Sequence, residues 1–259
     1  MNRYDKESTI IKDFQSFDHS DVCLLTNGVH RLYNQLHNPK EWNYWIDNSS
    51  KKSLPPDFYN EKLKLMMDVM RVDDHSFINE KGQVINPTNQ RESQIFKEML
   101  KINPSLKQAA DEGHIFINPY TGLDTDEDHN YGFYVNTFNR VVKNHIDKIS
   151  DYKKNHPDYK VIFFILDESS PYAIILDGSN PKNPGDGFFG QPHFWWYDKN
   201  MMDCTKDSGI DYIVWMTPYK HFENKEKLEL PKAIIINLKK FNYKKLYPYD
   251  PSEMYSLER

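Results

Sequence analysis

The sequence VIFFILDESSP, residues 161–171, decides the fold prediction. Its apolar run, from Val161 to Leu166, is followed directly by two carboxylates, two serines and a proline. A second run of this kind, DYIVWM at 211–216, is followed by Thr-Pro-Tyr-Lys at 217–220. Apolar runs of this length are typical of strands buried on both faces, and α/β proteins place binding sites beyond strand ends. The sequence therefore predicts a buried β-sheet with a site at its edge.

Further elements are predicted on both sides of this stretch. Strands are expected at 63–72, at 172–176, where the chain turns back as a neighbour of the 161–166 strand, and at 233–238. Amphipathic spacing or capping residues predict helices at 24–37, 90–102, 134–150 and 198–208. Helices that alternate with strands in this way predict a mixed β-sheet flanked by helices, of α/β or α+β class.

The chain is also expected to have a small N-terminal part. A polar, aromatic link from Asn38 to Phe58, containing Pro55-Pro56, follows the first predicted helix. The 259 residues are close to the size at which single domains begin to split. We therefore predict an N-terminal helical subregion at 1–58, packed on a mixed-sheet α/β domain at 59–259.

Composition restricts the class of protein but not its partner. The 14% aromatic content with only 10 Gly indicates a globular protein rather than a disordered or repetitive one. A net charge of −5 neither indicates nor excludes nucleic acid, which would need a local basic patch. The candidate patches are Lys51-Lys52, the run from Lys220 to Lys227, Lys239-Lys240 and Lys244-Lys245. For each of them, a solvated face is the commoner interpretation.

Targeting signals and metal-binding cysteines are not recognisable. Cys23 and Cys204 are far apart and form no C-x-x-C pair, which fits a reducing compartment. The first residues lack the pattern of a signal peptide, and no apolar run approaches the roughly 18 to 20 residues that span a bilayer. We therefore expect a cytoplasmic protein without a membrane partner, and the oligomeric state stays open.

Carboxylates gather at or near the ends of the predicted strands. The strand at 63–72 carries Asp68 and runs into Asp73-Asp74-His75, while the strand at 161–166 runs into Asp167-Glu168. If these strands are neighbours, their ends converge into a pocket of carboxylates and imidazole, a ligand set suited to Mg²⁺ or Mn²⁺. The predicted metal ligands are Asp68, Asp74, Asp167 and Glu168.

The same strand ends suggest catalytic roles. Asp167 and Glu168 would act at the metal, His193 would be a ligand or a base, and Lys220 would stabilise negative charge on the substrate. This arrangement predicts a divalent-metal-dependent hydrolase of phosphodiesters, resembling a nuclease in its chemistry. The acid-x-lysine triplets of the chain, however, all lie outside predicted strand interiors, so the PD-(D/E)xK nuclease pattern is not matched.

Two structural interpretations compete with this chemistry. The segment from Asp167 to Pro171 is also a good turn sequence, in which the carboxylate binds backbone amides. Likewise, Asp68 is either functional or hydrogen-bonded in the core, and His145 is expected to be a core histidine with one hydrogen bond.

An aromatic segment suggests other functions. The loop at 188–197 contains Phe194-Trp195-Trp196-Tyr197 and predicts, as the alternative, a non-enzymatic binding protein that docks a partner there. A sugar-processing enzyme with two carboxylates is a weaker third possibility. The Walker A, G-x-G-x-x-G, G-x-S-x-G and H-E-x-x-H motifs are all missing, which disfavours the common nucleotide-binding folds and serine hydrolases.

Overall fold

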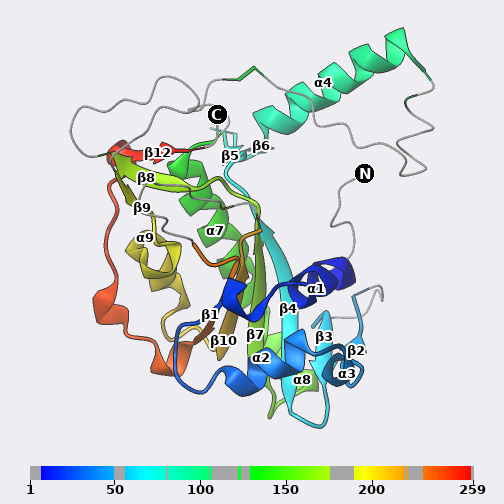
Figure 1. Ribbon diagram of the computed structural model, residues 1–259, viewed down its shortest axis with the longest axis vertical. Coiled ribbons are helices and arrows are strands. Elements are labelled where there is room, and N and C mark those ends of the chain that lie inside the picture. The colour runs from blue at the N-terminus through cyan, green and yellow to red at the C-terminus, as the bar shows by residue number, and fades with distance from the viewer. Residues whose placement is uncertain are drawn as a thin grey trace.

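A seven-stranded mixed sheet forms the centre of the molecule, in the order β1-β11-β10-β7-β4-β3-β2 (Figure 1). This computed structural model describes residues 7–49, 56–79, 81–104, 106, 122–123, 129–175, 190–218, 220 and 230–257. The strands of the sheet are β1 (Val22–Leu24), β2 (Ile46–Asp47), β3 (Phe58–Asn60), β4 (Leu65–Val72), β7 (Lys160–Asp167), β10 (Tyr212–Met216) and β11 (Ala233–Asn237). A mixed sheet flanked by helices confirms the predicted fold class, and the order is that of an α/β fold.

The three central strands β4, β7 and β10 run parallel to one another. β11 is antiparallel to β10, β1 is parallel to β11, and β3 and β2 add antiparallel strands at the other edge. Every residue of β7 after Lys160 is buried, and β11 is buried throughout, as expected for strands covered on both faces.

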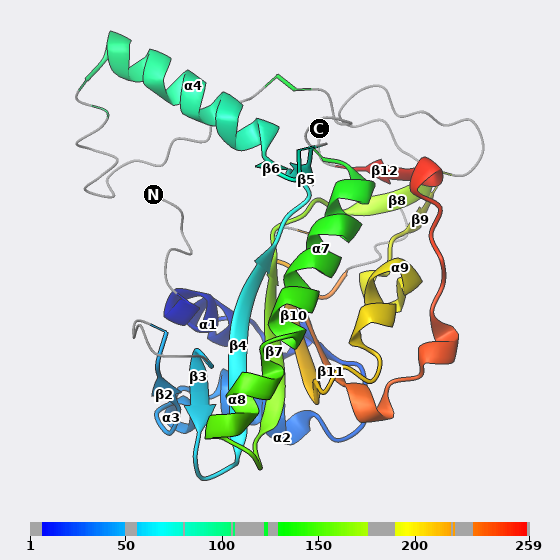
Figure 2. The same cartoon turned by 180° about the vertical axis from the view of Figure 1, so that it is seen from behind.

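Helices cover both faces of this sheet (Figures 1 and 2). One face is covered by α7 (Tyr131–Ile146), α8 (Ile149–Asn155) and α9 (Lys199–Met202), and the other by α1 (Glu7–Gln15), α2 (His30–His37) and α3 (Pro39–Trp42). Alternate strand residues divide between two cores, because successive side chains point to opposite faces. Phe163 and Trp215 pack toward α7, whereas Phe164 and Val214 pack toward α1 and α2.

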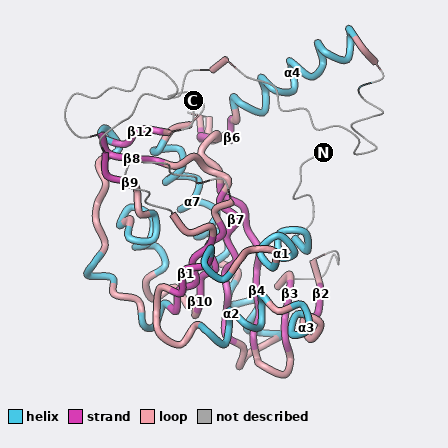
Figure 3. The backbone as a smooth tube through the Cα atoms, in the orientation of Figure 1, coloured by secondary structure: helices cyan, strands magenta, loops and turns pink. Residues whose placement is uncertain are grey.

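A smaller sheet lies beyond the carboxyl ends of the central strands (Figure 3). It consists of β8 (Tyr172–Ile175), β9 (Gly190–Pro192) and β12 (Met254–Ser256), in the order β12-β8-β9. The prediction that the 172–176 strand pairs with the 161–166 strand is therefore wrong. Both sides of β7 are already occupied by β4 and β10, and the turn after Asp167 directs the chain into the second sheet.

The remaining elements extend from this body. A two-stranded ribbon of β5 (Phe77–Ile78) and β6 (Val84–Ile85) leads into α4 (Pro87–Ile102), which projects away from the sheets (Figures 1 and 2). The predicted helix at 198–208 is the short α9 followed by a 3-10 turn, Asp203–Thr205. Further 3-10 turns are His19–Asp21, Trp195–Tyr197, Leu238–Lys240, Tyr243–Lys245 and Pro251–Glu253.

The N-terminal segment packs on the main sheet and also takes part in it. Besides α1, α2 and α3, it supplies the edge strands β1 and β2. Its buried side chains, among them Phe14 and Leu36, share one core with β7 residues such as Phe164. Within the described ranges, no helix combines the length and apolar character needed to cross a bilayer.

Candidate functional site

The parallel strands β4, β7 and β10 end at the same edge of the sheet, which we call the carboxyl edge. The chain continues from them into Asp73-Asp74-His75, into Glu168-Ser169-Ser170 and into Thr217-Pro218. Asp74, Asp167, Ser169 and Ser170 are all fully buried. In open α/β sheets, ligands bind at this edge of the strands.

Asp167, the last residue of β7, is surrounded by hydrogen-bond donors. It accepts bonds from the hydroxyl of Tyr134 at 2.5 Å, from Nε1 of Trp215 at 2.9 Å and from the Ser169 hydroxyl at 2.6 Å. The backbone N–H of Ser169 donates a further bond at 3.0 Å. The turn interpretation of this segment is therefore part of the observed geometry, together with a buried ion pair to Lys220 at 3.1 Å.

Lys220 is a buried cation held by this carboxylate. Its Nζ lies 3.1 Å from the hydroxyl of Tyr134, and 4.3 and 4.6 Å from the ring centroids of Tyr134 and Trp195. Burial lowers the pKa of Lys220, while the charge of Asp167 opposes that shift. A side chain with about 1% exposure is placed to compensate buried carboxylates rather than to meet a substrate directly.

Asp74, which follows β4, is joined to the turn after β7. It accepts bonds from the Ser170 N–H at 2.8 Å, the Ser170 hydroxyl at 2.5 Å and the Tyr172 hydroxyl at 2.7 Å. Burial opposes the charged form of Asp74, but His129, His75 and Ser170 outweigh it and lower its pKa to about 2. Asp74 is therefore a carboxylate that stays ionised throughout the physiological pH range.

Two histidines lie beside Asp74, and all three side chains are of types that can bind a metal ion. His129 Nδ1 and His75 Nε2 lie 3.4 and 3.6 Å from Oδ1 of Asp74, and one ligand atom from each residue falls within 4.8 Å of the others. Donor atoms around a tetrahedral ion with bonds of about 2.1 Å are roughly 3.4 Å apart. Both imidazoles are partly exposed, at 23% for His75 and 16% for His129, so the group opens toward solvent.

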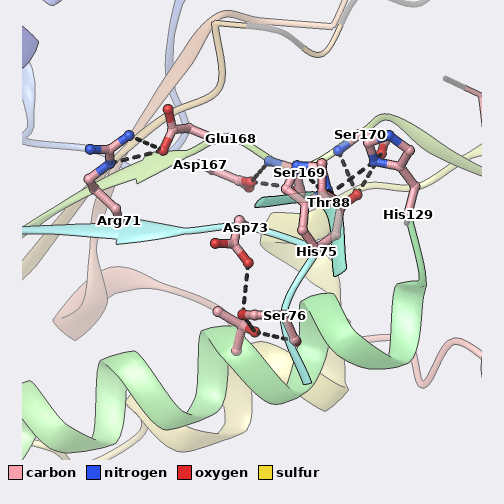
Figure 4. A network of polar contacts seen from close by, with 12 residues as sticks. Arg71, Asp73, His75, Ser76, Thr88, His129, Asp167, Glu168, Ser169 and Ser170 are labelled. Atoms are coloured by element: carbon pink, nitrogen blue, oxygen red, sulfur yellow. Dashed lines mark hydrogen bonds and ion pairs between the residues drawn. The ribbon is translucent and has the colours of Figure 1, made fainter. Parts of the chain in front are cut away.

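Neighbouring residues orient these imidazoles (Figure 4). The Thr88 hydroxyl, on α4, lies 3.3 Å from Nδ1 of His75, and the Ser170 hydroxyl lies 2.8 Å from Nδ1 of His129. The two rings meet edge to face with their centroids 4.7 Å apart. A bond to the nitrogen that faces away from the ion fixes ring orientation in metal sites, and Thr88 makes this kind of contact with His75, whereas Ser170 contacts the same nitrogen of His129 that faces Asp74.

His193 forms a separate buried pair with Asp198. Its Nε2 lies 2.8 Å from Oδ2 of Asp198, which also accepts a 2.6 Å bond from the Tyr131 hydroxyl. Nδ1 of His193 has no hydrogen-bond partner among the described residues. Burial lowers the pKa of His193, while Asp198 opposes that shift, and at 1% exposure the ring is enclosed by aromatic rings.

Glu168 lies apart from Asp167 although it follows it in the chain. Strand alternation directs the two side chains to opposite faces of the sheet. Glu168 pairs instead with Arg71, at 2.6 Å from Nη2 and 2.9 Å from Nε (Figure 4). Burial raises the pKa of Glu168, and Arg71 opposes that shift.

Asp68 also lies away from the carboxyl edge, in the middle of β4. It is bonded to His145 and accepts a 2.7 Å bond from the Tyr152 hydroxyl. Burial opposes the charged form of Asp68, but His145 and Tyr152 outweigh it and lower its pKa. The neighbouring Asp57 shows the opposite shift: burial, followed by the charge of Asp68, raises its pKa to about 7. Asp68 and His145 thus form a core hydrogen bond, which is one of the two possibilities considered for this carboxylate.

The structure therefore divides the predicted site residues among five groups. Asp167 and Lys220 form one, Asp74 belongs to the histidine group, His193 pairs with Asp198, and Asp68 and Glu168 lie elsewhere. Burial lowers the pKa of Lys220, and the charges of Asp167, Asp74 and Asp198 all oppose that shift. The first three groups therefore form one electrostatic unit.

Several members of this unit were not predicted. His129 lies 55 residues from Asp74 in the sequence, and no local motif announces it. Tyr134 and Tyr172 fall within a predicted helix and a predicted strand, and the sequence does not mark their hydroxyl groups, although buried tyrosines usually bond theirs to a buried acceptor. Ser170 was recognised only as a turn residue.

The aromatic loop and the lysine patches, which were candidate partner surfaces, are described only in part. In the described part of the aromatic loop, Trp195 and Trp196 are buried and Phe194 and Tyr197 pack against the core, while residues 188–189 lie outside the described residues. Lys239 pairs with Asp211 at 2.7 Å, and Lys51-Lys52 and residues 221–227 lie outside the described residues.

Comparison of the chain with models of protein families, with curated proteins and with solved structures found no match.

Proposed function

We propose that this protein is a divalent-metal-dependent hydrolase of phosphodiesters, with Asp74, His75 and His129 as the metal ligands. The observation that carries the proposal is the spacing of these three side chains, each with a donor atom within 4.8 Å of the others. Their position at the carboxyl edge of three parallel strands supports it, because ligands of α/β proteins gather there.

The ligand types determine which ion is proposed. Two imidazoles and one carboxylate suit Zn²⁺ or Mn²⁺ better than Mg²⁺, which prefers oxygen ligands and retains its water. Of the two ions first considered, Mn²⁺ therefore remains, and Zn²⁺ joins it. Three protein ligands leave positions open for water and substrate, as in catalytic zinc sites.

The proposed chemistry follows from such an ion. A bound metal with an open position makes hydroxide available near neutral pH and polarises a phosphoryl oxygen. The ionised Asp74 is ready to bind the metal, and Ser170 and Tyr172 hold its second oxygen. The buried Asp167–Lys220 pair is not part of the ligand group. It would influence the site through its charges, because Lys220 and Asp74 interact electrostatically.

The binding-protein alternative ranks second. In the described part of its loop, the aromatic side chains pack into the core and leave little ring surface for a partner. The nuclease-like function and the binding function also differ in their response to metal, which makes them separable by experiment.

Thermal unfolding with and without metal tests the proposal. The EDTA-treated protein is melted with Zn²⁺, Mn²⁺, Mg²⁺ or Ca²⁺. An ion at 100 times its dissociation constant adds about 2.7 kcal/mol, which for a chain of this size corresponds to roughly 5 to 10 °C. We expect such a shift with Zn²⁺ or Mn²⁺, its loss in His129→Gln, and its retention in His30→Gln, which changes an exposed histidine on α2.

Activity is then measured on the metal-loaded protein. Bis(p-nitrophenyl) phosphate and labelled oligonucleotides serve as substrates, and His129→Gln and His30→Gln serve as the matched pair. Hydrolysis that requires both the ion and His129 supports the proposal. If none of the four ions shifts the melting temperature, the proposal of a metal site is wrong. If an ion binds but no phosphodiester is hydrolysed, the proposal of a hydrolase is wrong.

A further inference from the structure

The opposite edge of the sheet, where β4, β7 and β10 begin, carries a cavity of about 350 Å³. We call it the amino-edge pocket. Its floor includes the first residue of each of these strands, Leu65, Lys160 and Tyr212. α2 and the turn between β3 and β4 form the walls. This volume lies within the range of about 300 to 1,000 Å³ that is typical of small-molecule sites.

The pocket is positively charged although the whole chain is acidic. Arg31, Lys62 and Lys160 line it, and no carboxylate does. None of these three cations forms an ion pair with another described residue; Lys62 and Lys160 only lie over the rings of Tyr44 and Tyr212, at 5.4 and 5.7 Å. In a protein of net charge −5, such a concentration of unpaired cations attracts anions.

The nearby acidic residues do not neutralise this charge. Asp211 is adjacent in the chain to Tyr212, but it pairs with Lys239 at 2.7 Å and accepts a 3.0 Å bond from the Val161 N–H. Glu41 accepts a 2.9 Å bond from Gln35 and lines the neighbouring cavity, where it is the single carboxylate against the three cations Arg31, Lys62 and Lys160 that line the two cavities. The positive charge of the pocket is therefore left for a ligand.

That neighbouring cavity, of about 120 Å³, extends the pocket toward an exposed aromatic ring. The two cavities share Arg31 and Lys62, and the second one adds Tyr44, which is 59% exposed. A large aromatic side chain exposed next to a basic pocket is a surface on which a planar ring can stack.

Backbone hydrogen bonds hold the walls in place. The carbonyl of Lys64 accepts a 2.8 Å bond from the N–H of Lys160, which joins the β3–β4 turn to the start of β7. Within that turn, the side chain of Asn60 accepts a 3.1 Å bond from the N–H of Leu63. A pocket whose walls are fixed in this way binds without a large cost of ordering.

We propose that the amino-edge pocket binds a nucleoside phosphate. The phosphate groups would contact Arg31, Lys62 and Lys160, and the base would stack on Tyr44. The site is independent of the proposed metal centre, because the two lie at opposite ends of β4, β7 and β10.

Calorimetric titration of the EDTA-treated full chain tests this proposal, with ADP and pyrophosphate as probes. EDTA removes any contribution from a metal site. We expect ADP to bind more tightly than pyrophosphate, because only ADP places a ring on Tyr44. Binding of both should weaken as NaCl is raised, since exposed charges are screened.

Variants locate the binding. Lys160→Ala and Arg31→Ala should each weaken ADP binding about tenfold, the effect of losing one charge-assisted hydrogen bond. Tyr44→Ala should weaken ADP but leave pyrophosphate unchanged. Lys206→Ala, at an exposed lysine outside both cavities, is the control and should change nothing.

Three results would overturn the proposal. The first is no ADP binding at millimolar concentration, or binding that Lys160→Ala and Arg31→Ala leave intact. The second is equal affinity for ADP and pyrophosphate, which would remove the nucleoside. The third is a single-stranded decanucleotide that binds far more tightly than ADP and loses its affinity in the same variants, which would replace the small ligand by nucleic acid.

Discussion

The two edges of the central sheet treat charge in opposite ways. At the carboxyl edge, Asp74, Asp167 and Lys220 are buried and bonded to one another or to tyrosine and serine hydroxyls. At the amino edge, Arg31 and Lys160 are exposed and have no carboxylate partner among the described residues.

This difference separates stability from binding. A buried charge must be compensated within the fold, so its loss leaves an unpaired partner and destabilises the protein. An exposed, unpaired charge contributes little to folding and remains available to a ligand. Substitutions at the two edges should therefore produce different phenotypes, and the following measurements, in order of expected effect, can break or sharpen the contrast.

Loss of the buried lysine should have the largest effect. Lys220→Met keeps the apolar stem but leaves Asp167 buried without a cation, and we expect a loss of about 3 to 5 kcal/mol in the free energy of unfolding. Urea unfolding measures it. The matched control is Lys232→Met, because Lys232 pairs with Asp21 at 3.0 Å with 41% exposure and should cost at most about 1 kcal/mol.

A second variant distinguishes the loss of charge compensation from a packing defect at Lys220. In the double variant of Asp167→Asn and Lys220→Met, the uncompensated charge is gone, and part of the lost stability should return. A loss below about 1 kcal/mol in Lys220→Met, or a double variant less stable than the single one, would contradict the compensation argument.

The neighbouring carboxyl groups of Asp57 and Asp68, which lie between the two edges, should have an intermediate effect on stability that depends on pH. Asp57 has its folded pKa raised to about 7 from 3.8, so its contribution to stability is complete below pH 4 and is lost as the pH rises toward 7. Asp57→Asn removes this dependence. From pH 5 to pH 8, we expect the variant to gain about 1 to 2 kcal/mol relative to the wild type, after allowance for solvent screening.

Urea midpoints at the two pH values measure this gain. Asp158→Asn, at an exposed position, provides the control and should keep a constant difference from the wild type. If Asp57→Asn likewise keeps a constant difference, the Asp57–Asp68 pair does not share a proton in the way that the raised pKa implies.

The amino edge should show the smallest effect on folding. Lys160→Ala and Arg31→Ala should each change the free energy of unfolding by no more than about 0.5 kcal/mol, the usual range for surface substitutions without specific partners. The same urea curves measure it. A larger loss in either variant would show that these cations stabilise the fold, and the contrast between the edges would disappear.

The buried strands were the most predictable part of the fold. β7, β10 and β11 coincide with apolar runs, because strands covered on both faces are built mostly of apolar residues, and β4 follows the same pattern apart from Asp68 and Arg71. The short strands β1, β2 and β3, at or next to the edges of the sheet, carry no such run and were not predicted. The predicted pairing of the 172–176 strand was wrong, because the sequence of a Ser-Ser-Pro turn does not indicate whether the chain returns to the same sheet or enters another one.

The candidate site was predictable only where it follows the strands. Asp74, Asp167 and Lys220 follow β4, β7 and β10 or end them, so parallel pairing was enough to bring them to one edge. His129 lies two residues before α7 begins, and only the tertiary fold places it beside Asp74. The separation of Glu168 from Asp167, in contrast, follows from strand alternation alone.

The pairing of β1 with β11 has a consequence for the order in which the sheet can form. Val22 pairs with Ala233, so β1 leaves the ribosome long before the strand with which it pairs. Closing a loop of this length is slow, because its entropy is lost before the contacts that compensate for it form. Until then, one side of β11 offers unpaired backbone groups, so this side is the part of the nascent sheet most exposed to pairing with another chain.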